Sequence, residues 1–299
     1  REFSDFVMDV MGIDRNHCTI GETEHPFTIN FSRDDVRITT HYHADMVASS
    51  LFSVIHEGGH ALYELHTGRE LARSNLGTGV SMGIHESQSR FYENIIGRSR
   101  AFCSVIYPWL KEHFAPRLDN VTEDDFYRMI NKSEPSLIRT EADELTYCLH
   151  IMVRYELEKR MFDGSLTAHD LPAEWNRLYK EYLGIDVPDD RQGVLQDSHW
   201  ANGNIGYFPS YAIGSAYGAQ YLQEMSRDLD VDAVVRSGDL TPINNWLEDR
   251  IWKHGCMKDP VALFESVCGK FDPDCYVAYL EKKFTEVYGR SEERRVGKE

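Results

Sequence analysis

Apolar residues recur every three or four positions through most of this chain, the spacing that places them on one face of an α-helix. Helices are therefore expected at 45–66, 86–114, 123–131, 136–162, 173–183, 208–229, 242–254 and 273–288. Alternation of apolar and polar residues is confined to 27–31 and 36–40, which flank a short polar turn and predict one β-hairpin. The pattern indicates a mainly α fold with a small β element.

The chain has no internal repeat and no stretch of linker composition, so residues 1–289 are expected to form one helical domain. The last ten residues, 290–299, include seven charged side chains and have no apolar periodicity. They predict a disordered or non-native tail that contributes nothing to the fold.

Composition argues against several classes of partner. The chain carries 49 acidic and 32 basic side chains, which give a formal net charge of −17. Nucleic acid and anionic membranes are not expected to bind it, since both attract clustered basic residues. No run of about 18 apolar residues is present, so a membrane-spanning helix is not expected. Six scattered cysteines without a CxxC pair indicate a reduced, cytoplasmic protein.

The strongest chemical signal is the pentapeptide His56-Glu57-Gly58-Gly59-His60 in the first expected helix. Histidines four residues apart lie on the same face of a helix, so their ring nitrogens can converge on one zinc ion. Glu57 lies on a neighbouring face, from which it can reach a metal-bound water without ligating the metal. Each glycine costs a helix up to about 1 kcal/mol relative to alanine, which predicts that substrate or another helix passes close by.

A catalytic zinc site needs a third protein ligand, and His66, His85 and Glu86 compete for this position. His66 has the spacing of the metzincin motif, but Tyr63 replaces the glycine that turns the chain there. If the helix continues, His66 lies about 240° around its axis from His60 and cannot converge with it. His85 and Glu86 open the next expected helix, where Glu86 would complete a His₂Glu ligand set.

Five short segments occur in a fixed order along the chain. They read DVRIT at 35–39, HEGGHALYE at 56–64, HESQSR at 85–90, IRTEADE at 138–144 and GYFPSY at 206–211. Together they resemble the motifs of the carboxypeptidase Taq family of metallocarboxypeptidases, with Ser210 in place of a threonine. The likeness extends from near the start of the chain to about residue 288.

The resemblance implies a helical gluzincin fold, similar to that of neurolysin-like peptidases and containing a cleft. It implies a divalent metal, usually zinc with cobalt able to substitute, bound by His56, His60 and Glu86. The implied activity is release of single amino acids from peptides with a free C-terminus, with broad specificity, by a homodimer. Family members carry a further N-terminal helical region, so this chain is expected to be a fragment.

The carboxypeptidase reaction needs a general base and groups that stabilise the oxyanion. Glu57 is expected to take the proton of the metal-bound water and pass it to the leaving amine. His199 and Tyr211 flank two glycines and are the candidate oxyanion donors. Tyr207 is the alternative tyrosine and a candidate for substrate binding.

An exopeptidase must also recognise the free carboxylate of its substrate, which suits the planar guanidinium of arginine. Arg139 is the first candidate and Arg37 the second. Because acidic residues follow Arg139 in an expected helix, an ion-pair network is the alternative interpretation of this residue. Rival functions are a helical zinc endo-oligopeptidase, a dipeptidyl carboxypeptidase and, from another class, an inactive metal-binding scaffold.

Overall fold

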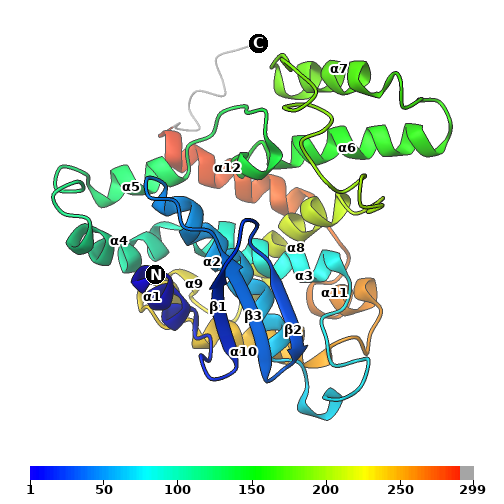
Figure 1. Cartoon of the computed structure of the whole chain (residues 1–299). Coiled ribbons are helices and arrows are strands. Elements are labelled where there is room, and N and C mark those ends of the chain that lie inside the picture. Colours follow the sequence, from blue (N-terminus) through cyan, green and yellow to red (C-terminus); the bar gives the residue numbers. More distant parts are fainter. Residues whose placement is uncertain (290–299) are drawn as a thin grey trace. The chain divides into compact units, whose positions relative to one another are not determined.

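The computed structural model describes residues 1–289 and is built mostly from helices (Figure 1). Unit 1 consists of Arg1–Ile130 and Gly214–Tyr279, and unit 2 consists of Asn131–Ile213 and 280–289. Both units combine segments that are distant in sequence, which is why no linker composition marks their limits. The tail predicted at 290–299 lies outside the described residues.

Unit 1 contains a three-stranded sheet in the order β1-β3-β2. The strands are β1 (Cys18–Glu22), β2 (Thr28–Ser32) and β3 (Asp35–Thr40). β2 and β3 form the predicted antiparallel hairpin, and β1 runs parallel to β3. The strand β1 was not predicted, because its five residues contain a glycine and only two apolar side chains, Cys18 and Ile20. Mainly α structure with a small sheet is therefore confirmed.

The helices of unit 1 are α1 (Glu2–Met11), α2 (Val47–Leu65), α3 (Met82–Arg90), α4 (Arg100–His113), α5 (Glu123–Ile130), α9 (Val231–Arg236), α10 (Thr241–Arg250) and α11 (Pro260–Cys268). Among them, α2 packs against β2 and β3 of this sheet, and the other helices pack on α2 or on one another (Figure 1). Two further helices, α8 (Pro209–Met225) and α12 (Asp274–Tyr288), each contain a boundary between the units. Within residues 1–289, no helix has both the length and the apolar character that a membrane span requires.

Two of the predicted helices are shorter than expected. The segment 86–114 is interrupted after a π-helical turn at Phe91–Ile96, because Ser99 caps a new helix by accepting the N–H of Phe102. The segment 136–162 becomes helical only at α6 (Tyr147–Phe162). Before it, the carboxylate of Asp143 accepts the N–H groups of Leu145 and Thr146, a local bond that competes with helix formation.

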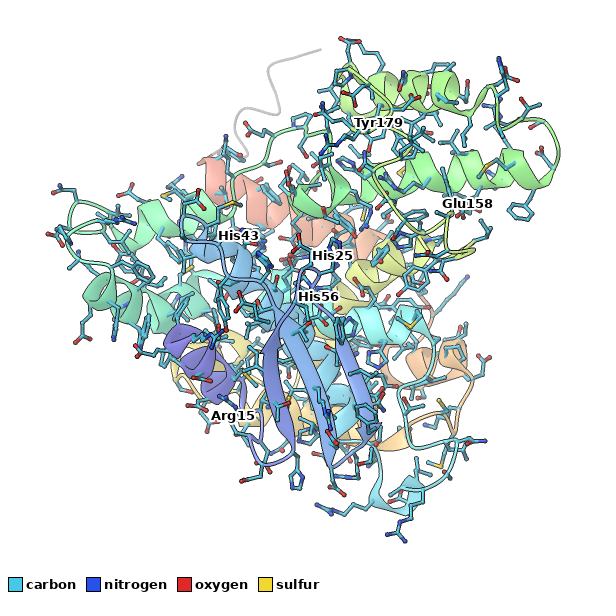
Figure 2. All side chains as sticks on the ribbon, in the orientation of Figure 1. Arg15, His25, His43, His56, Glu158 and Tyr179 are labelled. Carbon is cyan, nitrogen blue, oxygen red and sulfur yellow. The ribbon has the colours of Figure 1, made fainter. Side chains whose placement is uncertain are left out.

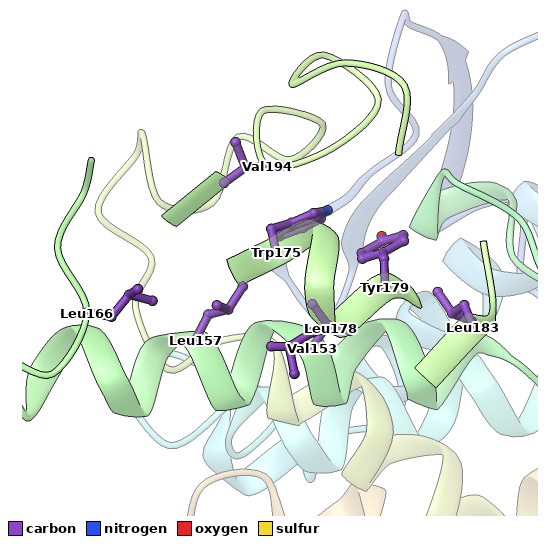
Figure 3. Packing of buried hydrophobic residues seen from close by; sticks show 8 residues of the cluster. All are labelled: Val153, Leu157, Leu166, Trp175, Leu178, Tyr179, Leu183 and Val194. Carbon is purple, nitrogen blue, oxygen red and sulfur yellow. The ribbon is translucent and has the colours of Figure 1, made fainter. Parts of the chain in front are cut away.

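Unit 2 is organised around the packing of α6 against α7 (Leu171–Leu183). Figure 3 shows the core between them, in which Trp175 is 1% exposed and Leu157 is completely buried. The other members are Val153, Leu166, Leu178, Tyr179, Leu183 and Val194. This core supports the polar side chains that α6 and the following loops contribute to the site described below.

Candidate metal centre

α2 positions the two histidines of the HExxH segment. The helix packs against β3 and α3, and its residues Leu51, Ile55 and Leu62 are at most 2% exposed. With this apolar face fixed, His56 and His60 lie one turn apart, and their ring centroids are 5.1 Å from each other. Figure 2 marks His56 on this helix.

The start of α3 positions Glu86. Ser81 caps α3 by accepting the N–H of Ile84, and Glu86 follows in the first turns of the helix with 3% of its surface exposed. Its Oε2 lies 3.4 Å from Nε2 of His60, and its Oε1 lies 3.9 Å from Nε2 of His56. One nitrogen or oxygen of each of the three residues lies within 4.8 Å of the others. We call His56, His60 and Glu86 the His-Glu cluster.

Glycines bring the supporting helices close enough for this arrangement. A Cβ atom on Gly59 would lie 2.7 Å from the carbonyl oxygen of Gln88, so α2 and α3 nearly touch there. A Cβ atom on Gly214 of α8 would lie 2.8 Å from the carbonyl carbon of Glu86. The prediction that another helix passes close to the glycines of HExxH is therefore confirmed at Gly59.

Further charged side chains orient the His-Glu cluster. Nδ1 of His56 lies 2.8 Å from Oε2 of Glu93, and Nε of Arg90 donates to Oε1 of Glu86 at 3.0 Å. A carboxylate that binds the outer nitrogen of an imidazole fixes its ring and leaves the other nitrogen for a metal. The sequence interpretation missed Glu93 and Arg90, although both follow Glu86 at helical spacings of seven and four residues.

The electrostatic environment of the cluster is strongly acidic. Burial alone would lower the pKa of His56, but the carboxylates of Glu86 and Glu93 outweigh it and raise this pKa to about 9. Burial would raise the pKa of Glu93, but Arg90 and His56 lower it to about 2. Burial lowers the pKa of His60, which favours its neutral, metal-binding form.

The two histidines that competed with Glu86 lie outside the cluster. Nδ1 of His66 is 2.8 Å from the carbonyl oxygen of Leu62, at the end of α2. Nδ1 of His85 is 2.7 Å from Nδ1 of His60, on the side of that ring opposite to its Nε2. Of the three candidate third ligands, the structure brings only Glu86 to the Nε2 atoms of His56 and His60.

The proposed base, Glu57, is 7% exposed and follows His56 on α2. Its Oε2 accepts a hydrogen bond from the hydroxyl of Thr28 at 2.6 Å, and its backbone carbonyl accepts one from the same hydroxyl at 3.1 Å. Thr28 begins β2, so the predicted hairpin restrains this carboxylate. No sequence signal pointed to Thr28.

In unit 2, Arg139 belongs to a buried ion-pair network. It lies in a 3₁₀ turn, not in the predicted helix, and is 6% exposed. Its Nη2 donates to Oδ1 of Asp197 at 2.7 Å, and Nη2 of Arg154 lies 2.5 Å from Oδ2 of the same carboxylate. We call Arg139, Arg154 and Asp197 the Arg-Asp cluster. It contains two positive charges and one negative charge.

The remaining candidates of unit 2 lie beside the Arg-Asp cluster. Nε2 of His199 is 3.0 Å from the hydroxyl of Tyr211, and the ring centroid of Tyr207 is 5.4 Å from both of their rings. The guanidinium carbon of Arg139 lies 4.9 Å from the ring centroid of Tyr211. The structure therefore brings Arg139 together with His199, Tyr207 and Tyr211, which the sequence singled out for roles other than carboxylate recognition. It also adds Asp197, which precedes His199 by two positions.

Arg37 pairs with a residue of its own strand. It lies on β3 of unit 1, where it is exposed and forms two hydrogen bonds with Asp35, at 2.9 and 2.8 Å. Its guanidinium carbon also lies 4.7 Å from the ring centroid of Phe31. The DxRxT segment thus forms a surface ion pair within one strand.

Comparison with known proteins decides the family. The family model described as carboxypeptidase Taq (M32) metallopeptidase matches residues 1–284. The chain belongs to the M32 family. Carboxypeptidase 1 of Bacillus subtilis (strain 168) is 43% identical over 290 residues, which cover 96% of this chain and 58% of that protein. Thermostable carboxypeptidase 1 of Thermus thermophilus is 42% identical over 292 residues, or 97% of this chain and 57% of that one.

Solved structures of M32 carboxypeptidases have the same fold. The enzyme from Deinococcus radiodurans R1 superposes with a TM-score of 0.94 at 38% identity, over 96% of this chain and 59% of that one. This M32 chain therefore spans less than two thirds of the length of these relatives. The fold and the family are shared over the aligned residues.

The His-Glu cluster fits the divalent metal that the M32 metallopeptidase family implies. Two imidazoles and one carboxylate form the ligand set of many catalytic zinc sites. In this M32 chain all three side chains are largely buried, and Glu93 holds His56 in a metal-binding orientation. A buried site surrounded by carboxylates favours a cation over an anion.

Proposed function

We propose that this chain is a zinc-dependent metallocarboxypeptidase that hydrolyses the C-terminal peptide bond of peptides and releases single amino acids with broad specificity. The observation that carries the proposal is the convergence of His56, His60 and Glu86 beside the buried carboxylate of Glu57. Membership of the M32 family, whose related proteins are named carboxypeptidases, supports the reaction type. Cobalt is the alternative metal.

In this proposal the His-Glu cluster holds the ion, which when bound supplies Lewis-acid activation of water and of the scissile carbonyl. Glu57 accepts the proton of the attacking water and delivers it to the leaving amine. The hydrogen bond from Thr28 restrains the carboxylate of Glu57, which keeps further lone pairs to accept the proton. This carboxylate has no ligand role, which separates the base from the metal site.

The residues of unit 2 are proposed to act on the substrate. Tyr211 and His199 donate hydrogen bonds to the developing oxyanion, and Tyr207 contacts the substrate. Arg139, with Arg37 as the second candidate, binds the terminal carboxylate. The excess of positive charge in the Arg-Asp cluster supports an anionic ligand near Arg139.

We further infer a homodimer in the cytoplasm. The family resemblance supports the homodimer. None of the six cysteines, all of which lie within the described residues, forms a disulfide, which supports a reducing compartment.

The experiment compares a peptide that has a free C-terminus with the same peptide amidated, each with and without a chelator. The proposal predicts that single amino acids are released, only from the free peptide and only without chelator. Released dipeptides would identify a dipeptidyl carboxypeptidase, and cleavage within the amidated peptide would identify an endo-oligopeptidase. Bound metal without any cleavage would indicate an inactive scaffold.

A further inference from the structure

His85 contacts the outer nitrogen of His60. The Nδ1 atoms of the two rings are 2.7 Å apart, at hydrogen-bond distance. Such a contact requires one proton between the two nitrogens, because two N–H groups would repel and two bare nitrogens would lack a donor. The ring that carries this proton decides whether Nε2 of His60 is free to bind a cation.

Glu64 lies on the other side of His85 and favours one arrangement. Its Oε1 is 2.6 Å from Nε2 of His85. The same carboxylate accepts hydrogen bonds from the hydroxyl of Thr78 at 2.9 Å, the N–H of Gly79 at 3.0 Å and the amide of Asn30 at 2.7 Å. A carboxylate surrounded by donors is itself an acceptor, so Nε2 of His85 carries a proton. In the neutral ring, Nδ1 is then an acceptor.

Close packing holds the ring of His85 in this orientation. A Cβ atom on Gly79 would lie 2.6 Å from Cδ2 of His85, so only glycine leaves room for the ring. The completely buried ring of Tyr63 lies 4.9 Å from it between centroids. The hydroxyl of Tyr63 in turn accepts the N–H of Val80.

We propose that His85, held by Glu64, is a positioning residue that keeps the proton of His60 on Nδ1 and leaves Nε2 free for a divalent cation. In this arrangement the Nδ1–H of His60 donates a hydrogen bond to Nδ1 of His85, and the Nε2–H of His85 donates one to Glu64. His56 reaches Glu93 directly, whereas His60 reaches a carboxylate through a second imidazole. This inference rests on the proposed function, since it concerns the same metal site.

The first test measures the Zn²⁺ dissociation constant of the full chain by competition with a chelator. His85→Leu removes the acceptor and should weaken binding about 10- to 100-fold, the usual effect of losing an outer partner. His85→Asn keeps an acceptor oxygen near the position of Nδ1 and should recover most of this loss. His66→Leu is the matched control, because it removes an imidazole at the C-terminal cap of α2 whose ring contacts the carbonyl of Leu62 and the ring of Trp252 instead of the His-Glu cluster.

Unchanged affinity in His85→Leu would overturn the proposal. Equal weakening in the Leu and Asn variants would also overturn it, since that result indicates packing alone. Circular dichroism of each metal-free variant checks that the helices are retained.

The second test reads the ring protons directly in wild-type chain with ¹⁵N-labelled histidine. Nuclear magnetic resonance should show His85 protonated at Nε2 and bare at Nδ1, both without metal and with Zn²⁺. A proton on Nδ1 of His85 would overturn the inference. If wild-type chain bound no Zn²⁺, the proposed function would fail, while the metal-free spectrum would still decide the state of His85.

Discussion

In unit 1, His56 lies between the carboxylates of Glu86 and Glu93, whereas in unit 2, His150 lies beside the guanidinium of Arg154. His150 is completely buried and His56 is mostly buried, and burial alone would lower both pKa values. The carboxylates reverse this effect and raise the pKa of His56 to about 9. At His150, burial and then the positive charge of Arg154 act in the same direction and lower the pKa to about 3.

The comparison shows that the sign of the neighbouring charge decides what each buried polar group can bind. Carboxylates outnumber cations around the His-Glu cluster, so this region suits a metal ion. Guanidinium groups outnumber carboxylates in the Arg-Asp cluster, so this region suits an anion such as a peptide carboxylate. The proposed carboxypeptidase reaction would use both properties, the first for the metal ion and the second for the substrate carboxylate.

The largest loss of activity is expected from replacing Glu57, which is next to His56 in the sequence and is proposed as the general base, not as a metal ligand. Glu57→Gln keeps the shape of the side chain but removes the proton acceptor. We expect a decrease in kcat of about 10²- to 10⁴-fold with bound zinc unchanged. Amino-acid release and metal content, measured on the same preparation, check this. Full activity in Glu57→Gln would remove the general-base assignment.

The next largest decrease in kcat is expected from removing the hydroxyl of Tyr211, which lies beside the Arg-Asp cluster. Tyr211→Phe removes one hydrogen bond to a developing negative charge, so kcat should fall about 10²-fold with little change in thermal stability. Tyr217→Phe, on the same helix, is the control. A decrease of less than about threefold in Tyr211→Phe would indicate that the tyrosine only packs.

The pKa contrast predicts a pH-dependent stability for unit 2. Unfolded His150 has a pKa of about 6.5, so it binds a proton more readily than folded His150 when the pH falls below that value. Its contribution is therefore complete above pH 6.5 and is lost progressively towards pH 3. This amounts to about 2 kcal/mol between pH 7 and pH 5.

Urea unfolding at several pH values checks this prediction. His150→Gln should flatten the decrease between pH 7 and pH 5, and His169→Gln, at an exposed site of unit 2, should not. An identical pH dependence in wild type and His150→Gln would contradict the assignment. For His56 in metal-free chain the sign is opposite, since its raised pKa gives a contribution that is lost as the pH rises through about 9.

The smallest change in activity is expected from the substitutions that compare Arg139 and Arg37, the two candidates for binding the substrate carboxylate. Arg139→Lys replaces a planar guanidinium in a buried network and should lower kcat/KM for free peptides about tenfold. Arg37→Lys changes a solvent-exposed pair with Asp35, and exposed ion pairs contribute little, so we expect less than a threefold change in kcat/KM. If the order is reversed, Arg37 and not Arg139 binds the substrate carboxylate.

The sequence predicted the elements that have strong local signals. The helix of HExxH, the β2-β3 hairpin and the placement of Glu86 at the start of the next helix all follow from periodicity and motif spacing. The strand β1 and the non-helical start of the 136–162 segment did not, because β1 depends on pairing with β3 and Asp143 competes locally with the helix.

In the candidate site too, the sequence predicted only the residues that have a local signal. His56 and His60 were singled out from their spacing, and Glu86 was preferred to His66 and His85 mainly because of the family resemblance. Glu93, Thr28 and Asp197 were not, because their roles depend on tertiary contacts that no local pattern encodes. Partners in other elements could be found only once the fold was known.

The most direct test of the metal site is the number of Zn²⁺ ions bound per chain, measured by equilibrium dialysis and elemental analysis for wild type and Glu86→Ala. We predict one tightly bound ion in wild type and an affinity lowered by at least about 100-fold in Glu86→Ala, since one of three protein ligands is lost. Equal stoichiometry and affinity in the two proteins would show that Glu86 does not bind the metal, and would contradict the His-Glu cluster as the catalytic centre.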